Sequence, residues 1–345
     1  MNPVLTGLLV GIAFGFVLQR GRFCMNSAFR DVVTLKDFTL LKSVGVALLV
    51  MLVGFSIMSM TGTIALNPKP LTWGANLLGS FIFGIGMVIA GGCASGITYR
   101  TGEGMVGAIT AVLGLSLGGY ITAAGFLADF KNNLQASTKI LTPEGTSLTW
   151  ANIIGMDHVL FAFIIAAIAV VVWFLLARGK EDEDIWGSSS GTLFEKIFKK
   201  GWGWLTTGLL IGLVSIVAFP LSAAAGRNYP LGITSGWIGI VKRVLDSANT
   251  LKWDAWLIIG IIVGALIAAL IAKEFKFRMP KAIVLLQTFV GGTLMGFGAV
   301  TSGGCNIGHL LSGIPQLSIG STLAGLSIVL GAWLTAYIMF VRPQK

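Results

Sequence analysis

Two long apolar segments of this chain, residues 73–90 and 282–300, end in the same break: two glycines followed by a cysteine. The breaks consist of Gly91, Gly92 and Cys93 and of Gly303, Gly304 and Cys305. Glycine pairs destabilise a helix interior. Inside a membrane, a helix break is tolerated only where protein buries it or where it lines a cavity. The sequence therefore predicts two broken helices that meet near the membrane centre, each presenting a cysteine.

The breaks belong to an internal repeat, in which five glycines and a cysteine recur at a constant offset of 212 residues. The first copy has Gly84, Gly86, Gly91, Gly92, Cys93 and Gly96, and the second has Gly296, Gly298, Gly303, Gly304, Cys305 and Gly308. Repeats with interrupted helices at corresponding positions typically mark the binding site of a transporter. We expect an internal pseudo-two-fold repeat, and the sequence leaves open whether it is inverted or parallel.

The composition fixes the class of protein. Of the 345 residues, 55% are hydrophobic and only 11% are charged, whereas a soluble protein carries about 25% charged residues. The prediction is an all-α polytopic membrane protein with about nine transmembrane helices and short broken or re-entrant half-helices. We expect one transmembrane domain, residues 1–345, made of a first repeat half (1–178), a hydrophilic linker (179–200) and a second half (201–345), with the linker in the cytoplasm.

The net charge of +10, from 24 Lys and Arg against 14 Asp and Glu, has two explanations that remain open. Cytoplasmic loops of membrane proteins are rich in Lys and Arg, and basic groups at the mouths of a pore attract anions. The basic residues flank the apolar segments and form no separate stripe. We therefore expect membrane lipids as neighbours and no nucleic-acid partner.

The three cysteines, Cys24, Cys93 and Cys305, are spaced too widely for a disulfide framework or a zinc pattern, and no metal site is expected. His158 and His309 are interpreted as structural. A buried cysteine is often only a small hydrophobic residue, but here every cysteine follows a break, which favours function. A neutral thiol is a weak donor that can hold a soft sulfur atom and release it, as conduction requires. The cysteines are predicted to line the path of a sulfur-containing anion.

Several neighbours of the cysteines join them as candidates for this path. The two glycine pairs precede half-helices, whose free N–H groups can face an anion without a buried charge. Arg22 and Arg100 flank the breaks, either as interfacial side chains or as an anion funnel, and Glu103 is expected to pair with Arg100. Asn306 is a further candidate donor to the ligand.

The sequence also excludes some classes of function. It has no Walker A motif, no Rossmann fingerprint and no pair of carboxylates within an apolar segment. This argues against an ATP-driven subunit or a proton relay, and it predicts no catalytic residues and no cofactor. The pattern favours a transporter over an enzyme.

With these motifs, the chain resembles the YeeE/YedE family of bacterial inner-membrane proteins over essentially its whole length. The resemblance is carried by GRFCMNSAFRD around Cys24, GIGMVIAGGCASG around Cys93 and GFGAVTSGGCNIGH around Cys305. It implies a compact multi-pass protein that takes up thiosulfate. It also implies that these three cysteines pass the ion along by S–H to sulfur contacts, without a covalent intermediate. A small cytoplasmic sulfur-carrier protein of the TusA type is the implied partner.

Three alternatives remain open. One is a membrane-embedded sulfurtransferase, in which one cysteine becomes a persulfide. Another is a transporter of a related sulfur or selenium species. The third is a structural or regulatory membrane partner of a sulfur-carrier protein, a role that needs no intact cysteines.

Overall fold

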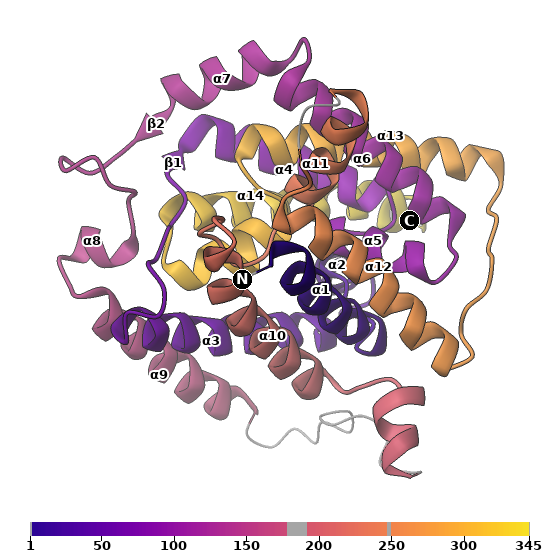
Figure 1. Ribbon diagram of the computed structural model, residues 1–345, viewed down its shortest axis with the longest axis horizontal. Helices are drawn as coiled ribbons and strands as arrows, with labels where there is room; N and C mark the ends of the chain where they lie inside the picture. The colour runs from indigo at the N-terminus through magenta and orange to yellow at the C-terminus, as the bar shows by residue number, and fades with distance from the viewer. Residues whose placement is uncertain (1, 178–191, 247–249, 345) are drawn as a thin grey trace.

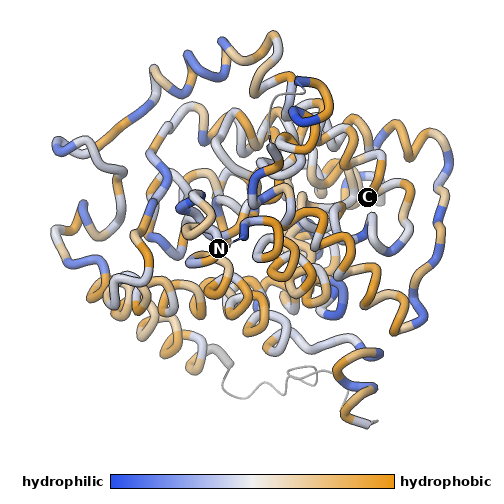
Figure 2. The backbone as a smooth tube through the Cα atoms, in the orientation of Figure 1, coloured by the Kyte–Doolittle hydropathy of each residue, from blue (hydrophilic) through white to orange (hydrophobic). Residues whose placement is uncertain are grey.

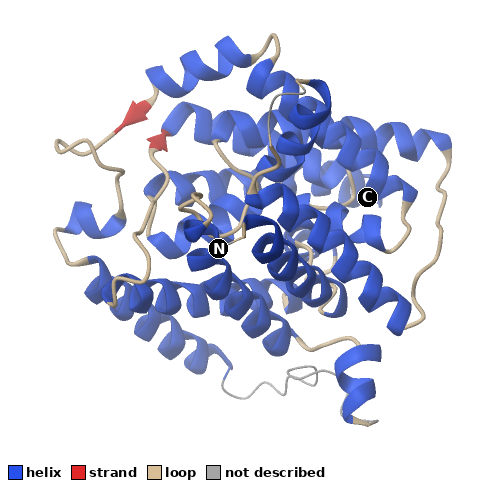
Figure 3. Cartoon of the chain, viewed as in Figure 1, coloured by secondary structure: helices blue, strands red, loops and turns tan. Residues whose placement is uncertain are grey.

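The computed structural model describes residues 2–177, 192–246 and 250–344. Helices make up most of this part of the chain (Figure 3). They are α1 Pro3–Arg20, α2 Met25–Thr34, α3 Thr39–Met60, α4 Trp73–Ile89, α5 Ala94–Gly102, α6 Val106–Ala124, α7 Ala128–Ser137, α8 Trp150–Ile154, α9 His158–Ala177, α10 Trp204–Ala224, α11 Thr234–Leu245, α12 Trp253–Ile271, α13 Ala282–Ser302 and α14 Ile319–Ala336. Two short strands pair antiparallel, β1 Leu71–Thr72 and β2 Lys139–Ile140. Short π and 3-10 turns cover Glu195–Lys199, Ile307–Leu311, Ile314–Gln316, Tyr337–Val341 and Arg342–Gln344.

Nine helical segments in the described ranges are long and apolar enough to cross a membrane. Figure 2 shows that the long helices are mostly hydrophobic, while polar colour gathers on α7 and on the connection between α12 and α13. The predicted all-α polytopic class is confirmed, and the chain is a multi-pass membrane protein. Three of the nine segments also contain the breaks or the short helices that follow them: Pro3–Thr34, Trp73–Gly102 and Ala282–Leu311.

The outer surface is apolar, as lipid requires. Helix α9 lies along α3 at the lower edge of Figure 1. Its large side chains point outward, and Leu160 and Phe174 are 54% and 67% exposed. Such a continuous apolar surface marks a membrane-facing region, so these side chains need no protein partner.

Inside the bundle, helices approach closely through glycines. Helix α1 packs on α12 and α3 packs on α10. At the first of these contacts, a methyl group added to Gly11 would lie 2.8 Å from the Cα of Gly260. Small residues let backbones meet in lipid, where hydrophobic burial does not drive helices together. The many glycines of the sequence are explained largely by this packing.

The two break-bearing helices, α4 and α13, pack antiparallel to each other. The Asn76 Nδ2 group, near the start of α4, donates to the Ser302 carbonyl at the end of α13 at 2.9 Å. The Gln287 Nε2 group, near the start of α13, donates to the Ile89 carbonyl at the end of α4 at 3.1 Å. Because these helices carry the two copies of one sequence pattern, the copies run in opposite directions, and the repeat is inverted.

Glycine contacts between α4 and α13 show the two-fold relation residue by residue. A methyl group on Gly79 would lie 2.7 Å from the Gly298 oxygen, and one on Gly86 would lie 2.6 Å from the Gly291 oxygen. At the offset of 212 residues, Gly291 is the counterpart of Gly79 and Gly298 is the counterpart of Gly86. Exchanging the two copies of the repeat therefore turns one contact into the other, as a two-fold axis between the helices requires.

The inverted arrangement decides where the breaks lie. Helices α4 and α13 meet along their length, and their breaks lie at opposite ends of the contact and not side by side. The predicted position of the breaks near the membrane centre stays a prediction. The cysteine-bearing turns approach one another through Asn306, whose Nδ2 lies 3.0 Å from the Met25 sulfur. Met25 directly follows Cys24 in the chain.

The boundaries of the two halves stay a prediction. Most of the linker, residues 179–191, lies outside the described residues. Its remainder contains the π-helical turn Glu195–Lys199, which leads into α10.

Candidate functional site

The first break turns the chain from α4 into α5. Gly91 has a φ of +71°, a left-handed conformation that glycine adopts without strain. Cys93 then caps the N-terminus of α5, because its sulfur accepts a hydrogen bond from the Gly96 N–H at 3.3 Å. The Ser95 hydroxyl lies 3.4 Å from the same sulfur. The local turn therefore holds the Cys93 thiol at the start of a half-helix.

Cys24 meets Cys93 at this turn. Cys24 precedes α2, just as Cys93 precedes α5, and the two sulfurs lie 3.6 Å apart. Both thiols are free and buried. A methyl group on Gly96 would lie 2.7 Å from the Cys24 sulfur, so only glycine leaves room for this pair. The structure thus brings together two of the three predicted pathway cysteines.

Arg100 covers the first break from the far end of α5. Its Nη1 group donates to the Gly91 carbonyl at 2.9 Å, and a methyl group on Gly92 would lie 3.1 Å from the same nitrogen. The expected pairing of Glu103 with Arg100 is wrong, since Glu103 forms an ion pair of 2.9 Å with Arg22. Arg100 therefore stays at the glycine pair, among the cysteines.

The second break repeats this geometry with different side chains. Gly303 has a φ of +84°, matching Gly91. Lys69 is the cationic residue at this break, and its Nζ group donates to the Gly303 carbonyl. A methyl group on Gly304 would collide with the same Nζ, as one on Gly92 would crowd Arg100. At each break, a cationic side chain thus donates a hydrogen bond to the carbonyl of the first glycine and lies close to the second glycine.

Lys69 was missed by the sequence reasoning. It lies in the loop before α4, within Asn67-Pro68-Lys69-Pro70, and belongs to neither copy of the repeated motif. The one signal that could have found it is a lysine held between two prolines directly before a break-bearing helix.

A cavity of about 700 Å³ opens beside the second break. Its wall includes Cys305, both glycines of the break, Tyr229 and five charged side chains, which are Lys69, Arg227, Lys242, Lys252 and Asp254. Four of these five are cations, so the cavity favours anions. Its size is in the range of small-molecule sites.

Arg227 is held by the protein itself. Its Nε lies 3.7 Å from an Asp254 oxygen, and its Nη1 group donates to the carbonyls of Tyr229 and Pro230 at 2.8 and 3.1 Å. Burial lowers the pKa of Arg227, and the Asp254 carboxylate opposes this shift. Arg227 therefore shapes the loop and adds positive potential to the cavity.

Lys69 sits above the ring of Tyr229, with its Nζ 5.1 Å from the ring centroid. The Tyr229 hydroxyl donates to the Gly308 carbonyl at 2.6 Å. Burial lowers the pKa of Lys69 to about 8, with the Cys305 sulfur opposing the shift and Arg227 adding to it. Burial also raises the pKa of Tyr229, which keeps its hydroxyl protonated.

Asn306 and His309 are buried next to Cys305 with unused polar atoms. Within the described ranges, Asn306 Oδ1 and His309 Nε2 have no hydrogen-bond partner. The other His309 nitrogen lies 3.3 Å from the Ser321 hydroxyl. No group of three or more metal-ligating side chains occurs in the described part of the chain.

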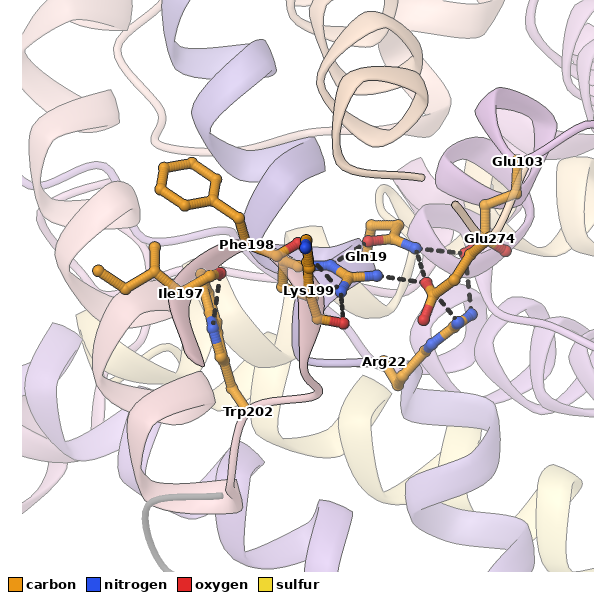
Figure 4. A network of polar contacts seen from close by, with 9 residues as sticks. Gln19, Arg22, Glu103, Ile197, Phe198, Lys199, Trp202 and Glu274 are labelled. Carbon is orange, nitrogen blue, oxygen red and sulfur yellow. Dashed lines mark hydrogen bonds and ion pairs between the residues drawn. The ribbon is translucent and has the colours of Figure 1, made fainter. Parts of the chain in front are cut away.

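Arg22, the remaining predicted pathway residue, lies in a polar network on the linker side (Figure 4). It forms ion pairs with Glu103 at 2.9 Å and with Glu274 at 2.8 Å. The neighbouring Arg20 also pairs with Glu274, and it donates to the Lys199 carbonyl at 2.8 Å. Burial tends to raise the pKa of Glu274, but the Gln19 hydrogen bond and both arginines outweigh it and lower the pKa. The structure thus commits Arg22 to carboxylates and does not bring it to the thiols.

Comparison with known proteins gives one family along most of the chain. A profile described as sulphur transport matches residues 20–334. The matched region contains all three cysteines, both glycine pairs and Lys69.

Two relatives match from end to end. A protein of Spirochaeta thermophila named thiosulfate transporter TsuA is 43% identical over 345 residues, covering 98% of this chain and 99% of the relative. A protein of the same name from Escherichia coli is 32% identical over 352 residues, covering 100% of this chain and 97% of the relative. A probable transporter YedE of Escherichia coli is 35% identical over 93 residues, which cover 27% of this chain and 23% of the relative.

Proposed function

Because this chain belongs to the sulphur transport family, we propose that it carries thiosulfate across the bacterial inner (plasma) membrane. The observation that carries this proposal is the end-to-end similarity to two proteins that are named thiosulfate transporters. Nine apolar helical segments in the described residues supply the membrane domain that such a function needs. The names of these relatives agree with transport and not with an enzyme.

We propose that the path runs past Cys24, Cys93 and Cys305, with the two glycine pairs, Asn306 and Arg100 beside them. A thiol can donate a weak hydrogen bond to the terminal sulfur of thiosulfate, whose oxygens prefer N–H groups and cations. The first break offers both kinds of donor, since two thiols lie 3.6 Å apart near Arg100. Weak donors suit a path along which the ion must leave each site.

Arg22 takes a different part in this proposal. Its ion pairs with Glu103 and Glu274 connect the turn before Cys24 with the ends of α5 and α12. We propose that it holds the path closed to water on the linker side, as a structural group and not as a ligand of the ion.

A small cytoplasmic sulfur carrier of the TusA type is the proposed partner on the linker side. The linker-side turn Glu195–Lys199 carries Lys196 and Lys199, which would suit an acidic partner surface. The resemblance to the YeeE/YedE family is the reason for choosing this class of partner.

The experiment is uptake of sulfur-labelled thiosulfate into proteoliposomes that contain the purified protein. Wild type is compared with Cys24→Ala, Cys93→Ala and Cys305→Ala, each checked for insertion and monodispersity. We expect wild type to take up thiosulfate, sulfate to compete poorly, and each variant to lose about tenfold or more, since a lost donor to an ion costs about 1.5–3 kcal/mol. Empty liposomes give the background.

The same preparation separates the alternatives. If one cysteine becomes a persulfide, mass spectrometry after turnover finds one added sulfur atom on a thiol, and the non-covalent path is wrong. If a selenium or other sulfur anion competes better than unlabelled thiosulfate, the substrate assignment changes. If all three variants transport like wild type, the cysteines only fill space.

A further inference from the structure

Cys24 and Cys93 form a pair of buried thiols that no covalent bond joins. Their sulfurs lie 3.6 Å apart, and both residues are free and 0% exposed. Both sulfurs also face one position of α5, since a methyl group on Gly96 would lie 2.7 Å from the Cys24 sulfur and 3.3 Å from the Cys93 sulfur. A hydrogen bond to a passing ion requires a thiol, but it does not require two thiols in contact. The contact between the two sulfurs is thus a separate property of this turn.

The two sulfurs lie close to the separation that a disulfide needs. A disulfide holds its sulfurs about 2.05 Å apart, so the two must approach by about 1.5 Å. Cys24 lies in the turn between α1 and α2, and Cys93 lies in the turn between α4 and α5. Both cysteines have extended backbone and belong to no helix. Rotation of the two side chains and a small shift of these turns therefore bring the sulfurs together without breaking a helix.

The surroundings of the pair stabilise the negative charge that a sulfur carries while it reacts. The Gly96 N–H, at the N-terminal end of α5, donates to the Cys93 sulfur at 3.3 Å, and the Ser95 hydroxyl lies 3.4 Å from it. Arg100 lies at the same turn, where it donates to the Gly91 carbonyl. Thiols near a helix N-terminus and a cation are the reactive ones. A reactive thiol beside a second thiol forms a reversible disulfide on oxidation.

We propose that Cys24 and Cys93 are an oxidative modification site, at which a small peroxide converts the two thiols into a disulfide that closes the thiosulfate path until a dithiol reduces it. The disulfide removes both S–H donors of the first break and ties the turn before α2 to the turn before α5. This inference rests on the proposed function, because uptake of thiosulfate is what the disulfide stops, and it adds a regulation of the same site.

Hydrogen peroxide is the oxidant, and the reaction balances without a further reactant. One thiol attacks a peroxide oxygen, so that the O–O bond breaks, a sulfenic acid forms and one water leaves. The second thiol attacks the sulfenic sulfur, so that the S–S bond forms, the S–O bond breaks and a second water leaves. The two sulfurs together lose two electrons, and the peroxide gains them. Because peroxide is neutral and smaller than thiosulfate, a path that brings the ion to these thiols also admits the oxidant.

Cys305 is an internal reference for this pair. It belongs to the second break, at the opposite end of the contact between α4 and α13. Among the described residues, the hydrogen bond between two cysteines joins Cys24 to Cys93. Cys305 should therefore remain a free thiol when the other two form the disulfide.

The first measurement counts free thiols in the purified protein before and after hydrogen peroxide. Catalase removes the peroxide, and alkylation after denaturation is read by mass spectrometry. We expect the alkylated cysteines of wild type to fall from three to one, because two of the three cysteines enter the bond. Cys305→Ala should lose both of its alkylated cysteines, with Cys24 joined to Cys93 in the peptide map. Cys24→Ala and Cys93→Ala should form no intramolecular disulfide.

The second measurement is uptake of labelled thiosulfate by wild-type proteoliposomes after the same treatment. We expect uptake to fall by the fraction of protein that contains the disulfide, and to return to its starting rate after dithiothreitol. The 11 methionines of the chain are also open to peroxide. Dithiothreitol does not replace the reductases that methionine sulfoxide requires, so recovery assigns the loss of uptake to thiols.

The outcomes are distinct. If all three wild-type cysteines stay alkylatable at a peroxide concentration that joins thiols in the denatured protein, the modification site is wrong. If the disulfide forms and uptake is unchanged, the pair does not control the path and the proposal fails. A bond that includes Cys305 overturns the assignment to Cys24 and Cys93. If untreated wild type takes up no thiosulfate, the proposed function fails, while the thiol count still decides whether the disulfide forms.

Discussion

Replacing Gly292 by alanine is expected to prevent most of the protein from folding, although the change adds one methyl group. Gly292 lies in α13 against α6, where the added carbon would overlap the Ala111 oxygen and lie 2.8 Å from the Ala111 carbonyl carbon and 3.0 Å from the Leu115 nitrogen. All three are backbone atoms, so no rotamer change relieves the contact. The two helices must separate, which loses the close packing that holds them in lipid. We expect a loss of about 3 kcal/mol or more.

The matched control is Gly239→Ala in α11, where an added methyl group meets nothing within 4 Å. Alanine is the better helix former by roughly 0.5–1 kcal/mol, so this variant should be as stable as wild type or more so. Both are measured as the monodisperse fraction and the Tm in detergent. Equal behaviour of the two variants would mean that α6 and α13 are not in close contact.

The second large effect is expected for Arg20→Met, because Arg20 pairs with Glu274 in the same polar network as Arg22. The Arg20 side chain is 1% exposed. Its Nε donates to Gln19 Oε1 at 2.6 Å, and its other nitrogens donate to Glu274 and to the carbonyls of Phe198 and Lys199. Removing it takes the Arg20 donor from the buried Gln19 Oε1 and from the part-buried carbonyls of Phe198 and Lys199. Breaking a buried ion pair costs about 3–5 kcal/mol, and we expect about 3, because Glu274 is partly exposed.

Arg22→Met is the control for this prediction. Arg22 pairs with the same Glu274 and with the buried Glu103, but its own side chain is 49% exposed, and ion pairs that water reaches contribute about 0–1 kcal/mol. The Tm should fall strongly for Arg20→Met and little for Arg22→Met. In the double variant Arg20→Met/Glu274→Gln, the loss should be smaller than the sum of the single losses. Additive losses would show that Arg20 and Glu274 do not interact.

What the sequence predicts well in this chain is local. Apolar runs of membrane length predict the helices, and Gly-Gly-Cys predicts a break because left-handed and closely approached backbone needs glycine. The left-handed conformation appears at Gly91 and Gly303, with φ values of +71° and +84°, and the close approach appears at Gly92 and Gly304. The sequence also indicates that Cys24 and Cys93 belong to one site, since each follows a break, but it does not predict that their sulfurs lie 3.6 Å apart.

What the sequence does not predict depends on contacts between distant segments. Lys69 and Tyr229 reach the second break from loops outside the repeated motif, so no spacing rule connects them to Cys305. Glu103 takes Arg22 as its partner and not Arg100, which is nearer in sequence, because the ends of α1 and α5 meet in space. The sequence also does not predict whether the two copies of the repeat run parallel or antiparallel, since an offset of 212 residues fits a parallel and an inverted repeat equally.

The inverted axis has a kinetic consequence. It relates two ends of one helix pair that carry different chemistry: two thiols with an arginine at one end, and a thiol, a phenol and a lysine at the other. On the proposed path, an ion is therefore captured and released at different rates from the two sides of the membrane. Microscopic reversibility forbids this asymmetry alone from changing the concentration ratio at rest. Net accumulation must come from outside the scaffold, from a reaction that consumes the ion or from a second gradient.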